Sequence, residues 1–389
     1  MAGQGSSSLR EANTTLVVQQ LRVAGPTSRA ELARRTGLSK QTVSTIVASL
    51  LADGVVRELG RGDPEPGGGR PATRLEYAAD RAFVAGVELG VGRTRVVLAD
   101  ALGSTVEPVD LEVRRSGRTP EVVVDRVCTA LQELLRRRGG LRRLRAVGIS
   151  VTGLVQPATG TCVLAPNLGW RDVPVAELVG RRLRSVPVVV RGAAQCSMVA
   201  EHREGVAVGE DDVVLLFEDE GVGAAVVERG RLLDGADGTA GELGHCAWPG
   251  ATERCGCGRR GCVETLASGP AVRRAVERAT GHRVRRRTGE PTFVALADVD
   301  DPAVAAAAGE AGQVLGTAAS WLVALTSPRL LVLSGSLVPG PAALRTSLEE
   351  AVRSREIGGH RTRIEAGALG ADAAVRGAVL LALDEARAG

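Results

Sequence analysis

One imidazole and three thiols lie within eighteen residues of this sequence, on His245, Cys255, Cys257 and Cys262. Thiolate and imidazole groups at such spacing can close a tetrahedron around Zn²⁺. Glycines between the thiols allow a short loop to fold back on the metal, because glycine accepts backbone angles that other residues resist. The sequence therefore predicts a zinc site formed by these four side chains.

Two carboxylates bracket this candidate metal cluster. Glu242 lies three residues before His245, and Glu264 lies two residues after Cys262. A metal between them would fix the backbone on both sides, and would thereby orient the two carboxylates toward a further ligand. Cys246 is out of phase with the four candidate ligands, and we expect it to take no part.

A helix-turn-helix pattern stands far upstream of the metal cluster. Ser28 and Glu31 form a capping box at the start of a predicted helix that ends at Gly37. A second helix begins near Lys40, and its apolar residues recur at the spacing of one buried face. A helix over residues 12–23 would complete a three-helix core. The apolar positions of the second helix are Val43, Ile46, Val47 and Leu50.

The other faces of this second helix are polar, as a DNA-reading helix requires. Predicted strands at residues 55–59 and 73–77 form a β-hairpin wing, and Arg70 near its tip could enter a minor groove, whose potential attracts arginine. The pattern predicts a winged helix-turn-helix bound to double-stranded DNA, with a helical hairpin that has no DNA role as the plainer alternative. The candidate DNA contacts are Ser39, Lys40, Gln41, Ser44, Thr45 and Arg70.

Length and charge agree with more than one domain and a nucleic-acid partner. A chain of 389 residues is too long for one ordinary core. Residues 1–77 hold ten Lys/Arg and seven Asp/Glu, a balance of +3, whereas the remainder holds 39 and 38, a balance of +1. We find no signal peptide and no apolar run long enough to cross a bilayer, so we expect a cytoplasmic protein without a membrane partner.

The rest of the chain alternates between strand and helix patterns. Strands are predicted over residues 83–90, 94–100, 145–153, 186–190, 213–217, 223–228 and 330–335, and helices over residues 120–138, 195–204, 268–279, 303–325 and 372–388. Such alternation in two sets is typical of a two-lobed α/β protein with a cleft. We expect two domains, residues 1–78 and 79–389.

Several motifs resemble those of the ROK family (repressors, uncharacterised frames, sugar kinases), in its transcriptional-regulator branch. The resemblance covers nearly the whole chain and implies an actin-like, hexokinase-type fold that binds a sugar between its lobes. It also implies that the zinc is structural, and that Asn167, Glu242, His245 and Glu264 contact sugar hydroxyls. The motifs are residues 28–34, Gly69-Arg-Pro71, Pro166-Asn-Leu-Gly-Trp170, Glu220-Gly-Val-Gly-Ala-Ala225 and residues 241–264.

The departures from the family's kinases bear on activity. Where those kinases carry Asn-Asp, this chain has Gly192-Ala193, and neither side chain can take a proton from a sugar hydroxyl. The first phosphate loop begins at Glu88 instead of Asp, and the late Gly-Gly turn reads Ser334-Gly-Ser336. Phosphoryl transfer needs a base and positioned phosphates, so the resemblance implies a catalytically inactive cleft. Ala193 also removes a sugar hydrogen-bond partner, which would weaken binding or alter the ligand.

We therefore expect a transcriptional regulator rather than an enzyme. It would repress carbohydrate-utilisation genes, bind a pseudo-palindromic operator as a homodimer or homotetramer, and respond to a sugar or sugar phosphate. Two alternatives stay open. One is an ATP-dependent sugar kinase with an appended DNA-binding domain, and the other is a repressor controlled by a protein partner.

Overall fold

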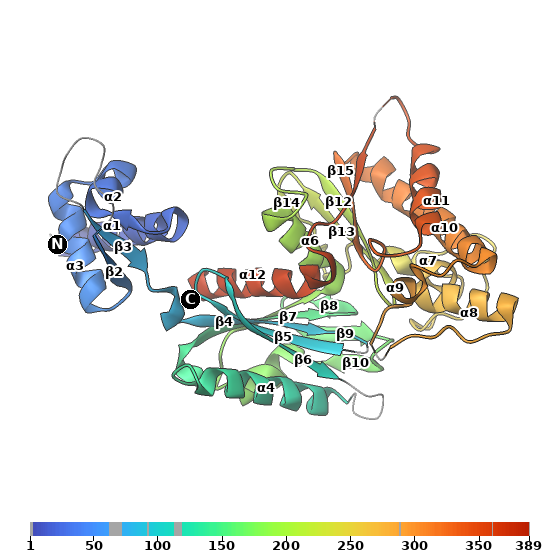
Figure 1. Ribbon diagram of the computed structural model, residues 1–389, viewed down its shortest axis with the longest axis horizontal. Coiled ribbons are helices and arrows are strands. Elements are labelled where there is room, and N and C mark those ends of the chain that lie inside the picture. The colour runs from blue at the N-terminus through green and yellow to red at the C-terminus, as the bar shows by residue number, and fades with distance from the viewer. Residues whose placement is uncertain are drawn as a thin grey trace. The chain divides into compact units, whose positions relative to one another are not determined.

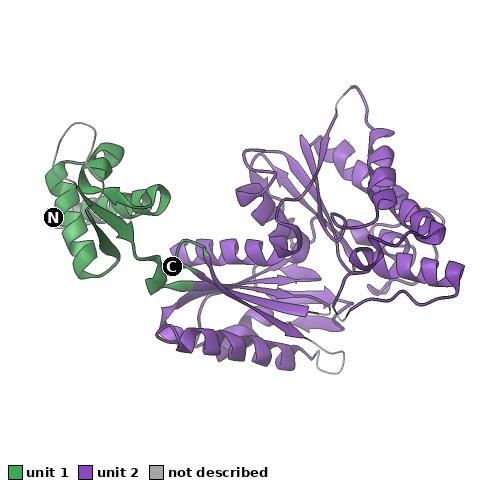
Figure 2. Cartoon of the chain, in the orientation of Figure 1, with its two compact units in different colours: residues 1–83, 100–104 green, residues 84–99, 105–389 purple. Residues whose placement is uncertain are grey.

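The computed structural model describes residues 3–61, 72–91, 93–112, 119–287, 289–359 and 361–388. The chain divides into two compact units, one made of residues 1–83 with 100–104 and the other of residues 84–99 with 105–389 (Figure 2). The expected domain boundary after residue 78 stays a prediction, whereas internal contacts divide the chain after residue 83. In the described ranges, no helix is both long enough and apolar enough to cross a bilayer.

The first unit combines helices with a small antiparallel sheet of strand order β1-β3-β2 (Figure 1). Strands β2 and β3 are the stems of the expected wing, whereas the wing tip with Arg70 lies outside the described residues. The elements are α1 (Gly3–Ala24), β1 (Thr27–Ser28), α2 (Arg29–Thr36), α3 (Lys40–Ala52), β2 (Val56–Arg61) and β3 (Thr73–Tyr77).

Local signals place the ends of α2 largely as expected. The Ser28 hydroxyl accepts a hydrogen bond from the backbone N–H of Glu31 at 3.2 Å, and Gly37 ends the helix in the left-handed conformation. The second half of the expected capping box is wrong, because the Glu31 carboxylate is held by the guanidinium groups of Arg34 and Arg35. Nearby arginines compete successfully with a backbone N–H for a carboxylate.

The first unit has its own core. All four apolar residues expected on the inner face of α3 are buried, and they pack with Val17, Leu21, Leu32 and Leu75 from the surrounding elements. The helix α1 begins at Gly3, well before the expected start at residue 12. Hydrophobic periodicity marks only the part of a helix that packs, so the polar start of α1 carried no signal.

The second unit begins with a mixed sheet of strand order β11-β7-β4-β5-β6. Figure 1 shows α12 (Ala373–Ala388) along one face of this sheet and α4 (Pro120–Arg136) along the other. The hairpin β5–β6 turns at Gly103, and its second strand β6 was not predicted from the sequence. The strands are β4 (Phe83–Leu89), β5 (Arg93–Asp100), β6 (Thr105–Glu112), β7 (Leu144–Val151) and β11 (Val188–Gly192).

A second large sheet has the strand order β14-β13-β12-β15-β16. Side chains alternate along β12: Val213, Leu215 and Phe217 pack on α6 (Ala193–Glu204). Val214 and Leu216 face the opposite way, toward helices farther along the chain. The other face of α6 packs with α12 against the first sheet, so α6 lies between the two sheets. The strands are β12 (Val213–Glu218), β13 (Val222–Glu228), β14 (Arg231–Leu232), β15 (Leu330–Gly335) and β16 (Arg363–Ala366).

Shorter elements complete the second unit. A three-stranded antiparallel sheet follows β7, and Trp170 in its last strand is buried, as expected for a core residue. The remaining elements are β8 (Leu154–Gln156), β9 (Thr161–Ala165), β10 (Trp170–Val173), α5 (Val175–Arg182), α7 (Val263–Ala267), α8 (Gly269–Thr280), α9 (Thr292–Leu296), α10 (Pro302–Thr326) and α11 (Ala342–Arg353).

Candidate functional site: a polar cavity beside a Cys/His cluster

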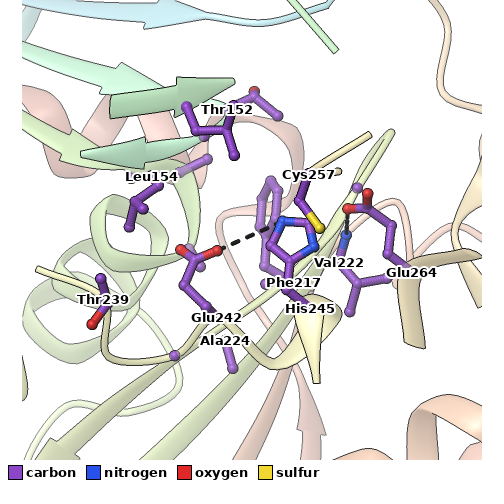
Figure 3. Close-up of a pocket in the computed structure, with 18 of the residues that line it drawn as sticks. Thr152, Leu154, Phe217, Val222, Ala224, Thr239, Glu242, His245, Cys257 and Glu264 are labelled. Atoms are coloured by element: carbon purple, nitrogen blue, oxygen red, sulfur yellow. Dashed lines mark hydrogen bonds and ion pairs between the residues drawn. The ribbon is translucent and has the colours of Figure 1, made fainter. Parts of the chain in front are cut away.

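The second unit encloses a cavity of about 560 Å³ at the N-terminal end of α6. All four residues expected to contact a sugar line it, and Figure 3 shows three of them, Glu242, His245 and Glu264, around one space. Asn167 comes from the β9–β10 turn, Glu242 precedes the short 3-10 helix Leu243–His245, and Glu264 lies in the first turn of α7. The fold thus brings together side chains that are far apart in the sequence.

The tight turn between β12 and β13 positions two of these side chains. The Asn167 amide donates a hydrogen bond to the carbonyl oxygen of Glu220 at 3.1 Å. The backbone N–H of Val222 donates to the Glu264 carboxylate at 3.2 Å. Between them, a Cβ on Gly221 would stand only 2.8 Å from the Glu264 carboxylate, so a larger residue would displace it.

A second glycine lets the Glu242 segment approach the sheet. Gly241 has φ +88°, and a Cβ there would lie 2.1 Å from the carbonyl oxygen of Ala224. Its own carbonyl accepts a hydrogen bond from the Ala224 N–H at 2.8 Å. Only glycine allows this close pairing, which carries Glu242 and His245 to the cavity wall.

The four expected metal ligands converge. One nitrogen of His245 and the sulfur atoms of Cys255, Cys257 and Cys262 all lie within 4.8 Å of one another. The Cys257 and Cys262 sulfurs are 3.7 Å apart, and the Cys255 sulfur is 3.6 Å from Nδ1 of His245. Ideal tetrahedral zinc with bonds of about 2.3 Å to sulfur and 2.0 Å to nitrogen gives about 3.8 Å between two sulfurs and about 3.5 Å between sulfur and nitrogen. The cluster can therefore hold a metal ion.

The two ring nitrogens of His245 face different surroundings. Nδ1 lies in the Cys/His cluster, whereas Nε2 lies 3.9 Å from the Glu242 carboxylate, the contact drawn in Figure 3. Cys246 is exposed and stands outside the cluster, as expected. The imidazole thus connects the cluster to the cavity.

Burial dominates the electrostatics of the cavity carboxylates. It raises the pKa of Glu242, and the nearby His245 ring opposes this rise. Burial likewise raises the pKa of Glu264, and the ring and the Val222 N–H oppose it. Carboxyl groups held in this way accept or donate hydrogen bonds strongly, which suits a ligand with several hydroxyl groups.

The position at which the resemblance places the kinases' catalytic carboxylate carries a methyl group in this chain, as expected from the sequence. Strand β11 ends at Gly192, α6 begins at Ala193, and the Ala193 side chain lines the cavity. Gln195, in the first turn of α6, is buried, and its side-chain oxygen accepts a hydrogen bond from the Gly192 N–H at 3.4 Å. Gln195 therefore braces the β11–α6 connection, and the position of Ala193 offers no proton acceptor.

Other cavity residues escaped the sequence analysis. Thr152 and Leu154 follow β7, Phe217 lies one residue before the end of β12, and Thr239 lies just before Gly241. Arg259, between the cluster thiols, adds a positive charge to the wall. The polar ends of buried strands were the available signal for Thr152, whereas no local pattern marks Thr239 or Arg259.

In the first unit, one polar face of α3 is exposed. It carries Ser39, Lys40, Gln41, Ser44 and Thr45, the five expected DNA contacts that the structure describes. Ser39 has a second role that the sequence analysis did not assign, because its hydroxyl caps α3 by accepting the Thr42 N–H at 3.1 Å. This exposed polar face has the properties of a recognition helix.

The two units together define a class: a winged helix-turn-helix joined to an α/β fold of the sugar-kinase type. The ROK family profile matches residues 84–385, and the MarR family profile matches residues 13–67. Because the ROK profile spans more than half of the sequence, the chain belongs to the ROK family.

Individual relatives extend this assignment. The xylose repressor of Bacillus subtilis (strain 168) is 26% identical over 349 residues, which are 89% of this chain and 88% of that protein. A crystal structure of a ROK family transcriptional regulator, homolog of the E. coli MLC protein, has a TM-score of 0.74 at 23% identity and covers 97% of both chains. A ROK family glucokinase from Streptomyces griseus, in complex with glucose and AMPPNP, has a TM-score of 0.68 at 26% identity and covers 79% of this chain and 100% of that chain.

Proposed function

We propose that this chain is a DNA-binding transcriptional repressor of carbohydrate-utilisation genes, controlled by a sugar or sugar phosphate bound in the 560 Å³ cavity. The observation that carries the proposal is the methyl group of Ala193 in a cavity whose other side chains include hydrogen-bonding partners for hydroxyl groups. Such a cavity can bind hydroxyl groups, but the position of Ala193 supplies no carboxylate to act as the base of phosphoryl transfer. The similarity to a repressor over 89% of the chain supports the same conclusion.

In this proposal the polar face of α3 enters the major groove. Ser39 and Lys40 stand at the N-terminal end of α3, where helix dipole and charge favour phosphate, and Gln41, Ser44 and Thr45 face base edges. Arg70 would reach the minor groove from the wing tip. Two copies in a homodimer or homotetramer would read a pseudo-palindromic operator. A repressor acts where the chromosome lies, so its proposed location is the cytoplasm.

The sugar would be held by hydrogen bonds to the four cavity residues. The Glu242 and Glu264 carboxylates would accept from hydroxyl groups, the Asn167 amide would supply either a donor or an acceptor, and Nε2 of His245 would complete the set. Bidentate contacts of carboxylates with neighbouring hydroxyls confer selectivity among sugars, because each unmatched polar group carries a penalty of about 1–3 kcal/mol.

We propose that the Cys/His cluster binds structural zinc. The separations of 3.6 and 3.7 Å between ligand atoms suit tetrahedral coordination. A metal on Nδ1 of His245 would fix the ring so that Nε2 points to Glu242. The ion would therefore organise the sugar site without touching the sugar.

The enzyme alternative is an ATP-dependent sugar kinase, and the similarity to a glucokinase supports this alternative. A kinase needs a base beside the attacking hydroxyl, and Ala193 provides none. We expect no ADP formation above background when the protein is given ATP and a panel of pentoses and hexoses. Turnover that depends on the sugar would contradict the assignment.

The decisive experiment selects genomic DNA fragments with the purified protein at fixed, near-physiological salt, and then offers sugars and sugar phosphates to the complex. The proposal expects one palindromic site and its release by a particular sugar. Glu242→Gln and Glu264→Gln should bind the same DNA but resist release, whereas Glu133→Gln, an exposed residue on α4, should behave as wild type. DNA binding without sequence preference would reject the proposed operator. Equal release of DNA by the sugar from wild type and all variants would reject the proposed sugar site.

A further inference from the structure

A second cavity, of about 340 Å³, lies in the same unit. Its wall includes Glu88 at the end of β4, Ser197 in the middle of α6 and Asp219 directly after β12. The late turn at Gly335 and Ser336 also lines it, so the cavity lies where the family resemblance places the phosphate loops of kinases. Phe217 lines both this cavity and the sugar cavity.

Two polar atoms at this second cavity lack partners. Ser197 is fully buried, and among the described residues its hydroxyl makes no hydrogen bond. The Oε2 atom of Glu88 is enclosed and equally unpartnered within the described ranges. Buried polar groups in folded proteins are almost always hydrogen-bonded, so two unpartnered polar atoms on side chains that line one cavity indicate a site for a bound partner. A carboxylate oxygen can only accept, so that partner must donate.

The charges at this cavity disfavour phosphate. Burial, together with the nearby carboxylate of Asp219, raises the pKa of Glu88 to about 7. Burial, together with the carboxylate of Glu220, raises the pKa of Asp219 to about 6. Arg93 opposes both rises. A triphosphate would bring more negative charge to two crowded carboxylates, whereas a cation would relieve their repulsion.

The arginines near Glu88 and Asp219 do not form ion pairs with these two carboxylates in the described structure. Arg95, which faces Glu88 from β5, is held by Asp110 and Asp372. Arg93 lines the cavity, and Arg287 lines it from an exposed loop. In the described structure neither of these two guanidinium groups forms an ion pair with Glu88 or Asp219. The two carboxylates are therefore not neutralised by contact with the protein's own cations.

We propose that the second cavity is a binding site for a small organic cation, a primary amine or diamine. Its ammonium group would donate to Glu88 and Ser197 and lie near Asp219. A bare metal ion would leave most of 340 Å³ unfilled, whereas cavities of this size suit small molecules. The site is separate from the sugar cavity but shares Phe217 and α6 with it, and the proposal does not depend on the sugar or the operator.

The test measures binding of putrescine to the full-length protein by calorimetry at about pH 8, with the diol of the same chain length as the neutral probe. The proposal expects saturable binding of putrescine and none of the diol. Glu88→Gln should weaken putrescine binding by at least about tenfold, the effect of losing one charge-assisted hydrogen bond. Ser197→Ala should weaken it less, and Asp219→Asn should weaken it through lost charge. Glu133→Gln on α4 serves as the matched control.

Acid should weaken the binding as well. As pH falls from about 8 to 5, Glu88 and Asp219 take up protons, while the ammonium stays charged. The affinity for putrescine should therefore fall as the pH passes through these two pKa values. The residual binding of the double variant with Glu88→Gln and Asp219→Asn should not depend on pH in this range.

Three results would overturn the proposal. The first is no saturable putrescine binding to folded wild-type protein. The second is equal binding to wild type, Glu88→Gln and Ser197→Ala, which would place the amine elsewhere. The third is binding of magnesium alone or of magnesium–ATP that Glu88→Gln abolishes, which would make the cavity an ion or nucleotide site.

Discussion

At the residue scale, His245 links two functions that the sequence analysis assigned to it separately. Its Nδ1 atom lies 3.6 Å from the Cys255 sulfur, and its Nε2 atom lies 3.9 Å from the Glu242 carboxylate. One ring can therefore ligate a metal and border the ligand cavity, because its two nitrogens point in different directions. The neighbouring Cys246 is exposed and takes no part in the Cys/His cluster.

The metal cluster gives a residue-level prediction. Cys262→Ser should abolish stoichiometric zinc binding and lower the free energy of unfolding by more than about 4 kcal/mol, as the loss of a metal site does. Cys246→Ser, which removes an exposed thiol from the same segment, should keep both zinc and stability. Zinc is measured by chelator titration and stability by denaturant unfolding.

Full zinc content in Cys262→Ser would show that the cluster is not the metal site. If wild-type protein lost its zinc to a chelator without change in stability or sugar binding, the ion would not be the organiser that we propose.

At the element scale, α6 is the central support of the second unit. It packs between the two large sheets, its first residues line the 560 Å³ cavity, and Ser197 in its middle lines the second cavity. A helix in such a position needs small side chains, and α6 carries Ala193, Ala194 and Ala200. In the first unit, α3 has a simpler division, with apolar residues inward and polar residues toward solvent.

The exposed face of α3 gives an element-level prediction. Lys40 is the only lysine of the sequence, so its substitution removes the one lysine charge that could contact a phosphate. If it contacts a phosphate, Lys40→Gln should weaken binding to all sequences alike and reduce the slope of log affinity against log salt by about 0.9. Arg137→Gln, which removes an equal charge from an exposed position of the second unit, should leave the slope unchanged.

An unchanged slope in Lys40→Gln would remove this residue from the phosphate contacts. Equal reductions in Lys40→Gln and Arg137→Gln would mean that net charge, and not the recognition helix, governs the salt dependence.

At the scale of the whole molecule, the proposed regulation is a coupling free energy between two ligands. A sugar in the second unit and an operator on the first can influence each other only through a differential affinity for two states of the protein. The proposal assigns the sugar to the second compact unit and the operator to the first. Coupling therefore requires two states of the protein that differ at both sites.

Linkage gives the prediction for the whole molecule. If the sugar weakens operator binding by a factor of about 5–150, bound operator must weaken sugar binding by the same factor. Sugar affinity measured by calorimetry with and without operator DNA checks this, and scrambled DNA is the control. A sugar affinity that ignores the operator, with release still observed, would point instead to a partner protein or a contaminant as the effector.

Much of the fold could be predicted because its signals are local. The inner face of α3, the capping hydroxyl of Ser28 and the helix stop at Gly37 follow from spacing within a few residues. Strand β15 was predicted at its observed bounds, because an apolar run ends in a glycine turn. The strands β8 to β10 escaped because such short elements carry weak periodicity. The helix α11 was also not predicted, although its buried residues recur at helical spacing.

The sequence by itself determined the four side chains that form a candidate metal site and the polar face of α3, because both depend on residue chemistry and short spacing. The lack of a base at Ala193 came from the resemblance to the family's kinases. Only the tertiary structure decided that Asn167 and Glu264 meet on the turn at Gly221, and that Glu88, Ser197 and Asp219 surround one cavity. The order of strands in a sheet brings such residues together, and that order depends on packing across the whole unit rather than on any local pattern.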